Sequence, residues 1–76
     1  MRPFIANILK AMANRPDEVL VSELNGRQTV ILEARCNPDD MGRIIGRNGK
    51  TIGAIRTIFS VLAARQKKRA LLEIVE

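Results

Sequence analysis

The chain has 76 residues, a formal net charge of +5 and an isoelectric point of about 10.4. A chain this short buries only about 60% of its unfolded surface, so we expect residues 1–76 to form one small, marginally stable domain. The absence of histidine and the single cysteine, Cys36, exclude an internal disulfide and the common zinc sites. No segment approaches the ~20 apolar residues of a membrane helix, and we expect a cytoplasmic protein without membrane association.

Residues 2–13 are predicted to form the first helix. Ile5, Ile8 and Met12 recur there at helical spacing and give one apolar stripe. Pro16 places the end of this helix shortly before it, because the residue preceding a proline disfavours the helical conformation. Asn7 and Lys10 interrupt the apolar run, so we interpret the start of the chain as a structural helix rather than a targeting signal.

A β-hairpin is expected next. Residues 18–24 are rich in Val and Leu, and residues 29–36 alternate between apolar and other side chains. Asn25-Gly26, which lies between them, is a strong signal for a hairpin turn. The alternation places four side chains of the second strand on one face: Val30, Leu32, Ala34 and Cys36.

Two helices and a strand complete the chain. Asn37 and Pro38 are typical of a helix start, and this short helix is expected to end near residue 45. A long helix is predicted over residues 50–66 and a last strand over residues 70–75. The order is α-β-β-α-α-β. Because two helices join the second and third strands, these strands should lie parallel in an α+β fold, with a three-stranded mixed sheet and three helices on one face.

Gly46-Arg47-Asn48-Gly49 separates the last two helices. Glycine permits a tight turn and lets another backbone come close, because it has no Cβ. The free N–H groups and the positive dipole end of the long helix face this loop, and Arg47 and Lys50 add charge. Eight Lys or Arg and no acid lie between residues 41 and 72. The pattern predicts a phosphate-binding site and an anionic partner.

Two other interpretations of this loop exist. Two adjacent helices require a turn in any case, and glycine after a helix is common. Gly49-Lys50-Thr51 matches the end of a nucleotide-binding P-loop, but that motif follows a strand and requires glycine where this chain has Ile44. No nucleophile–base pair is present, and Asp39 and Asp40 are better explained as helix-start residues. We therefore expect no enzyme, no metal and no cofactor.

The residues around the loop form an apolar-Ile-Gly-x-x-Gly-x-x-Ile frame between two helices. This frame resembles the KH domain, and the element order looks like its type II, prokaryotic form over essentially the whole chain. KH domains clamp about four nucleotides against such a loop. With DMGRIIGRNG and AIRT around the loop, the chain also resembles the KhpA family of small bacterial RNA-binding proteins.

The resemblance implies non-catalytic binding of single-stranded RNA, as an RNA chaperone or post-transcriptional regulator. It also implies a larger KH partner of the KhpB/Jag type and a role in cell elongation, cell shape, cell-wall biogenesis and envelope homeostasis. Loop N–H groups would contact phosphate, and Ile45 and Ile52 would form the floor under the bases, with core packing as the alternative for them. The expected RNA-binding residues are Gly42, Arg43, Ile45, Gly46, Arg47, Asn48, Gly49, Lys50, Ile52 and Arg56.

Base stacking on aromatic side chains is not expected. The chain has only Phe4 and Phe59, and Phe59 lies in the apolar stripe that should face the sheet. We therefore expect weak, salt-sensitive RNA binding with modest sequence preference. A second basic cluster, of Arg65, Lys67, Lys68 and Arg69, is interpreted as a helix end, where cations offset the negative end of the dipole. The alternative is that this cluster extends the nucleic-acid track.

The long helix also carries a second apolar stripe, formed by Ile58 and Val61 with Ala54 and Arg65 beside them. Because the core of so short a chain is marginal, we expect this surface to form a homodimer, or a heterodimer with another KH protein. The alternative is that Ile58 packs at the core edge and Val61 is a single exposed apolar residue. A second functional hypothesis is a protein-interaction or scaffold subunit of a ribonucleoprotein complex, with little RNA binding of its own.

Overall fold

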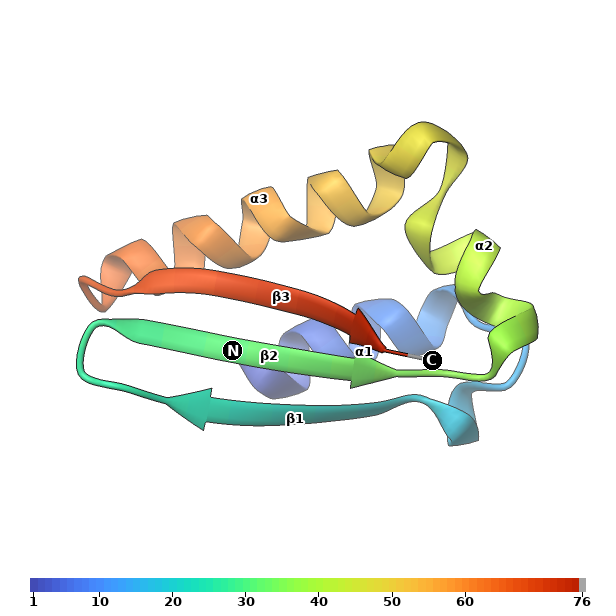
Figure 1. Ribbon diagram of the computed structural model, residues 1–76, viewed down its shortest axis with the longest axis horizontal. Coiled ribbons are helices and arrows are strands. Elements are labelled where there is room, and N and C mark those ends of the chain that lie inside the picture. The colour runs from blue at the N-terminus through green and yellow to red at the C-terminus, as the bar shows by residue number, and fades with distance from the viewer. Residues whose placement is uncertain (76) are drawn as a thin grey trace.

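The computed structural model describes residues 1–75 of the chain. Its helices and strands follow the predicted order, α-β-β-α-α-β, close to the predicted bounds (Figure 1). They are α1 (Arg2–Met12), β1 (Leu20–Asn25), β2 (Thr29–Arg35), α2 (Met41–Ile45), α3 (Lys50–Arg65) and β3 (Arg69–Val75). Single 3-10 turns precede β1, α2 and α3, at Pro16–Glu18, Pro38–Asp40 and Arg47–Gly49.

β2 is the central strand of a three-stranded sheet. It pairs antiparallel with β1 and parallel with β3, so that Leu32 lies opposite both Glu23 and Leu72. The hairpin predicted from Asn25-Gly26 is confirmed, because the Gly26 N–H donates to the Thr29 carbonyl at 2.8 Å. The predicted mixed sheet and the predicted parallel pairing of the last two strands are confirmed as well.

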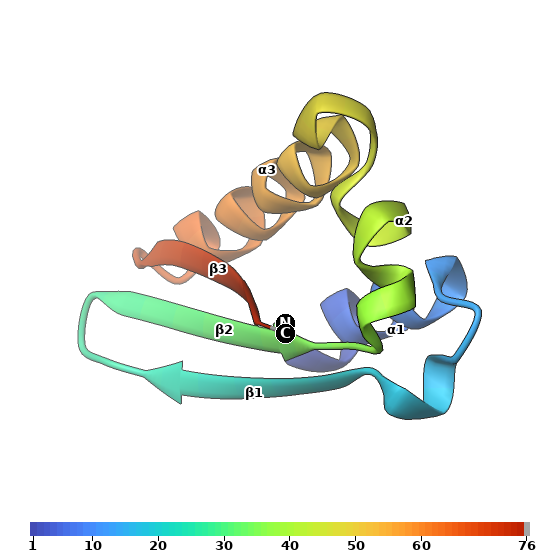
Figure 2. The ribbon, with the colours of Figure 1, turned by 45° about the vertical axis from the view of Figure 1, so that its right-hand side comes forward.

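The core lies between one face of the sheet and the helices. The side chains of β2 alternate as predicted, and those on the inner face are buried. The core draws chiefly on β2, α1 and α3, with Val30, Leu32, Ala34, Ile5, Leu9, Ile52, Ile55 and Phe59. Figures 1 and 2 show the helices behind and beside the sheet, and no helix crosses the sheet face that Figure 1 turns toward the viewer.

Asp40 connects the start of α2 to the end of α1. As predicted, Asn37 caps the turn before α2, since its side-chain oxygen accepts from the Asp39 N–H at 2.9 Å. The Asp40 carboxylate is buried and accepts from two backbone N–H groups, of Asn14 at 3.0 Å and of Arg15 at 3.1 Å. Asp40 is therefore more than the helix-start residue expected from the sequence, because it fixes α2 against a segment distant in the chain.

The C-terminal end of α3 is closed by local hydrogen bonds. The Lys68 N–H donates to the Ala63 carbonyl at 3.0 Å, and the Lys67 N–H donates to the Ala64 carbonyl at 2.9 Å. Lys67 takes the left-handed conformation with φ 58°, which this pair of hydrogen bonds requires. α3 is the longest helix, with 16 residues.

No helix within residues 1–75 combines the length and the apolar character needed to cross a membrane.

Candidate nucleic-acid interface

Gly46 ends α2 and lets α3 start close to it. Its backbone has φ 76° and ψ 173°, a region that is essentially restricted to glycine. A Cβ added at this position would overlap the Thr51 side chain and lie 2.9 Å from the Thr51 backbone nitrogen. Both the conformation and the contact therefore require glycine at this point, which is a structural reason independent of any ligand.

Gly49 differs from Gly46 in its surroundings. It is left-handed, with φ 73° and ψ 14°, but a Cβ built there would meet nothing within 4 Å. Asn48 is also left-handed, with φ 56°, and asparagine tolerates this conformation better than most residues. The Gly49 N–H donates to the Gly46 carbonyl at 3.2 Å and closes the turn. The loop is thus tight on the side of Gly46 and open above Gly49.

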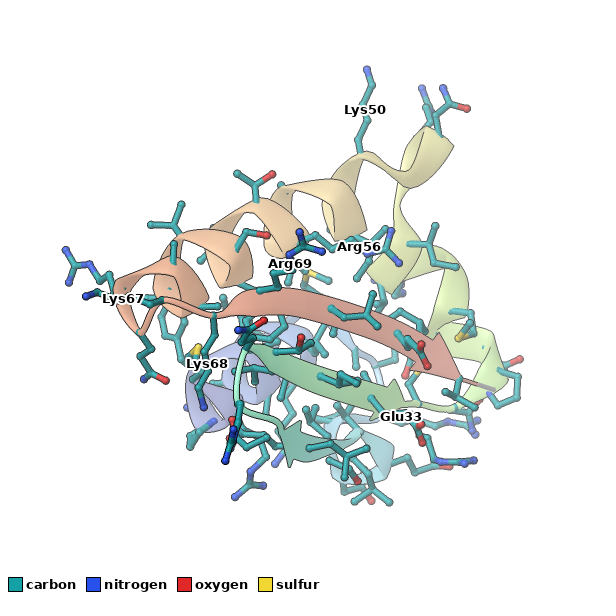
Figure 3. The ribbon with its side chains drawn as sticks, turned by 60° about the vertical axis from the view of Figure 1, so that its left-hand side comes forward. Glu33, Lys50, Arg56, Lys67, Lys68 and Arg69 are labelled. Carbon is teal, nitrogen blue, oxygen red and sulfur yellow. The ribbon has the colours of Figure 1, made fainter. Side chains whose placement is uncertain are left out.

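Two exposed cations lie at the start of α3. Arg47 is at the tip of the loop and Lys50 is the first residue of the helix, whose first turn contains no acid. Neither side chain takes part in an ion pair within the described residues 1–75. Figure 3 shows the Lys50 side chain directed away from the rest of the molecule. Cations at the positive end of a helix dipole are unfavourable by roughly 0.3–1 kcal/mol each, so this arrangement favours an external anion.

The rim of the loop is formed by α2. Gly42 is exposed, and a Cβ built on it would meet nothing within 4 Å. With the Asn14 side-chain oxygen turned toward Arg43, the Arg43 Nε and Nη2 donate to this oxygen at 3.3 Å. The exposed Arg43 guanidinium thus lies within hydrogen-bond distance of Asn14 at the end of α1, and it contributes positive charge beside the loop.

The isoleucines that flank the loop are not equally accessible. Ile45 is half-buried, whereas Ile44 is 1% exposed and Ile52 is 5% exposed, and both of these belong to the core. Core packing, the alternative considered from the sequence, therefore describes Ile44 and Ile52. The floor that the sequence predicted under the bases has Ile45 as its accessible part, and Ile52 has little surface to offer.

Arg56 has an internal partner that the sequence does not reveal. Its Nε and Nη2 donate to the carbonyl of Leu72 in β3, at 3.3 Å and 3.2 Å. In Figure 3 the side chain lies between α3 and β3, and Lys50 points outward from the start of the same helix. From the sequence, Arg56 was expected to offer an extra contact to RNA. Two of its five N–H groups are instead used inside the molecule, although the residue is exposed.

The residues predicted to form a dimer interface lie together on α3 and are all exposed. They are Ala54, Ile58, Val61 and Arg65. Ile58 is 42% exposed and Val61 is 59% exposed, so the long helix does carry an apolar stripe that the sheet leaves uncovered. Next to it is a hollow of about 350 Å³ between α1 and the end of α3, lined by Met1, Phe4, Leu62, Arg65 and Gln66.

The Cys36 thiol is a buried group near α2. It donates to the Met41 sulfur at 3.3 Å. Burial, with the Asp40 carboxylate as the smaller cause, raises the pKa of Cys36 above its ordinary value. The thiol is therefore protonated near neutral pH and unsuited to act as a nucleophile.

Comparison with known proteins identifies relatives that cover the whole chain. RNA-binding protein KhpA of Clostridium acetobutylicum is 41% identical over 75 residues, which is 99% of this chain and 100% of the relative. RNA-binding protein KhpA of Chlamydia pneumoniae is 43% identical over 76 residues, 100% of this chain and 97% of the relative. No solved structure matched. The sequence model of the family described as KhpA/KhpB, KH domain, matches residues 2–74, and the chain therefore belongs to this KH-domain family.

Proposed function

We propose that the chain binds single-stranded RNA without catalysis, through the loop Gly46–Gly49 and the first turn of α3. The observation that carries the proposal is the position of Arg47 and Lys50. Both are exposed at the positive end of a helix dipole and have no acidic partner within residues 1–75. Their charge lowers the stability of the isolated chain and is balanced when a phosphate binds. The relatives named above are RNA-binding proteins by name, which supports RNA as the anion.

The proposed mode of binding follows from the space around the loop. A phosphate lies above Gly49, where no side chain obstructs the approach of a nucleic-acid backbone. Arg47 and Lys50 contact it from two sides, and the bases lie toward Gly42 and Ile45 on α2. No aromatic side chain is available there, because Phe59 is fully buried and Phe4 lines the hollow at the far end of α3. We therefore expect modest affinity and strong salt dependence.

The test is fluorescence anisotropy with short single-stranded RNA and the matching DNA across a salt series. The variant Arg47→Gln/Lys50→Gln removes two charges at the loop. The control variant Lys67→Gln/Lys68→Gln removes two charges at the other end of α3. We expect only the loop variant to bind much more weakly and to lose about 0.7 from the salt slope, the value for one phosphate contact on a single strand. An equal loss in both variants would mean diffuse charge attraction, and no binding by the native protein would favour the scaffold function.

We also propose that α3 pairs with another KH protein, either a second copy or a larger partner of the KhpB/Jag type. The exposed Ile58 and Val61 support this second function. The family resemblance extends the proposal to an RNA-chaperone role in cell elongation and envelope homeostasis. The variant Val61→Asp should sediment as a folded monomer, while Ser60→Asp, on the same helix, should keep the native sedimentation coefficient. A native dimer that persists in the Val61→Asp variant would contradict the proposal.

A further inference from the structure

The sheet face opposite the helices carries an apolar row that no element within residues 1–75 covers (Figure 1). The strand register places Leu24 opposite Ile31, and Ile31 opposite Leu71, so the three side chains cross the sheet in one line. Leu24 is 65% exposed and Leu71 is 45% exposed. Paired residues on neighbouring strands share a face and touch one another. The row is therefore continuous, in contrast to apolar residues scattered singly over a surface.

The next row along the strands is acidic. Glu33 lies directly opposite Glu73, and it occupies the same face two residues after Ile31. Like charges directly opposite each other destabilise a sheet. Arg35 forms an ion pair with Glu33 at 3.6 Å, but within the described chain no cation is paired with Glu73. Figure 3 shows Glu33 on β2, at a distance from the basic end of α3 marked by Lys67 and Lys68.

This combination restricts what can cover the face. An RNA strand or an anionic membrane surface would meet Glu33 and Glu73 at the middle of this face. The register also places Arg69 and Arg35 on it, but at its two ends, and Arg35 is already paired with Glu33. A second copy packed face to face about a twofold axis parallel to the strands would place the acidic row against its own equivalent, which costs stability. A cationic group between apolar side chains matches the face in both charge and hydrophobicity. The open sheet face therefore suits a different partner from the basic loop, which is proposed to bind RNA, and from the stripe of Ile58 and Val61, which is proposed to bind a KH protein.

We propose that the open sheet face binds an amphipathic helix of another protein, in which a Lys or Arg lies between two apolar residues one turn away on either side. Alternate residues of a strand are about 6.7 Å apart. Residues four apart in a helix are about 6.0 Å apart. A helix lying along β3 with the sequence apolar–cation–apolar at positions i, i+4 and i+8 therefore matches Leu71, Glu73 and Val75.

The test uses the full chain, labelled with ¹⁵N, and two synthetic amphipathic helical peptides of about 16 residues. The first peptide has Leu, Lys and Leu at i, i+4 and i+8, and the second has Glu in place of Lys. We expect the Lys peptide to shift amide resonances of β2 and β3 with a dissociation constant below ~1 mM. We expect the Glu peptide to bind measurably more weakly, with a dissociation constant up to about fivefold higher, because one exposed ion pair contributes an effect of this size.

Two variants locate the charge effect. In Glu33→Gln/Glu73→Gln, the two peptides should bind alike. In the control Asp17→Asn/Asp39→Asn, which removes two exposed acids elsewhere, the preference for the Lys peptide should persist. The proposal is overturned if neither peptide binds at 1 mM, if both bind the native chain equally, or if the shifts map to α1, α3 or the glycine loop. It is also overturned if dilution alone moves the same strand resonances, since the face would then bind a second copy.

Discussion

The two ends of α3 carry similar charge and differ in what that charge does. At the C-terminal end, Arg65, Lys67 and Lys68 lie where the helix dipole is negative. Cations at this end are expected to stabilise the helix without a ligand, which is the interpretation made from the sequence. At the N-terminal end, Arg47 and Lys50 lie where the dipole is positive, and their charge opposes the helix.

The backbone differs between the two ends as well. The C-terminal end has one left-handed residue, Lys67, within a set of local hydrogen bonds to α3 itself. The N-terminal end has three positions with positive φ among the four residues of the loop, Gly46, Asn48 and Gly49, and the first of them packs against Thr51. Basic composition alone therefore says little about a nucleic-acid site. The position of each cation relative to the helix dipole, together with free space at the backbone, distinguishes a binding end from a stabilised end.

The largest effect is expected at Gly46. Gly46→Ala puts a side chain into a glycine-only conformation and against the Thr51 backbone, so the free energy of unfolding should fall by about 3 kcal/mol or more. Gly49→Ala meets only the left-handed penalty and should lose about 1 kcal/mol. Urea unfolding of both variants measures the difference. If the two losses were equal, the close approach of Thr51 to Gly46 would not matter.

The next effect concerns how the binding end is attached to the rest of the molecule. Asp40→Ala removes a buried carboxylate that accepts from the Asn14 and Arg15 N–H groups, and the free energy of unfolding should fall by about 2 kcal/mol. Its exposed neighbour provides the control, because Asp39→Ala should change this energy by less than about 0.5 kcal/mol. Thermal and urea unfolding test this, and a similar loss in both variants would contradict the role of Asp40.

Asp40 also marks what the sequence could not predict. The hairpin, the buried face of β2 and the parallel β2–β3 pair depend on local turns and alternation, and these were predicted correctly. The Asp40 bonds span 26 and 25 residues, and the Arg56 bonds to the Leu72 carbonyl span 16. Such partners depend on how elements pack in space, and no local pattern encodes them. An acid after Asn-Pro and an arginine on a helix fit simpler explanations equally well.

The same limit applies to the isoleucines around the glycine loop. The alternating and helical patterns show that Ile44, Ile45 and Ile52 are near the core, but helical spacing cannot say which of them stays accessible. Packing of α2 between the ends of the other helices decides this, and it leaves only Ile45 partly exposed. The apolar row on the open sheet face was missed for a related reason. It becomes continuous only when the register of three strands is known.

Charge reversal tests the comparison of the two ends directly. Lys50→Glu should raise the free energy of unfolding by about 1 kcal/mol, because a carboxylate suits the positive end of the dipole, and it should abolish RNA binding. Arg65→Glu, at the other end of α3, should lower this energy by a similar amount and leave loop binding largely intact. Urea unfolding at low and high salt measures both, and the two changes should shrink as salt increases. Changes of the same sign would contradict the dipole argument.

The smallest effect is expected at Lys67, whose left-handed backbone is strained for any residue with a Cβ. Lys67→Gly relieves this strain and should raise the free energy of unfolding by about 0.5–1 kcal/mol relative to Lys67→Ala, which removes the same charge. Gln66→Gly supplies the opposite case, since Gln66 has φ −96° and gains nothing from glycine, so stability should fall. If RNA affinity changed equally in the Gly and Ala variants at position 67, the lost charge and not the backbone conformation would explain the change at this end of α3. Backbone conformation would then matter for RNA binding only at the glycine loop.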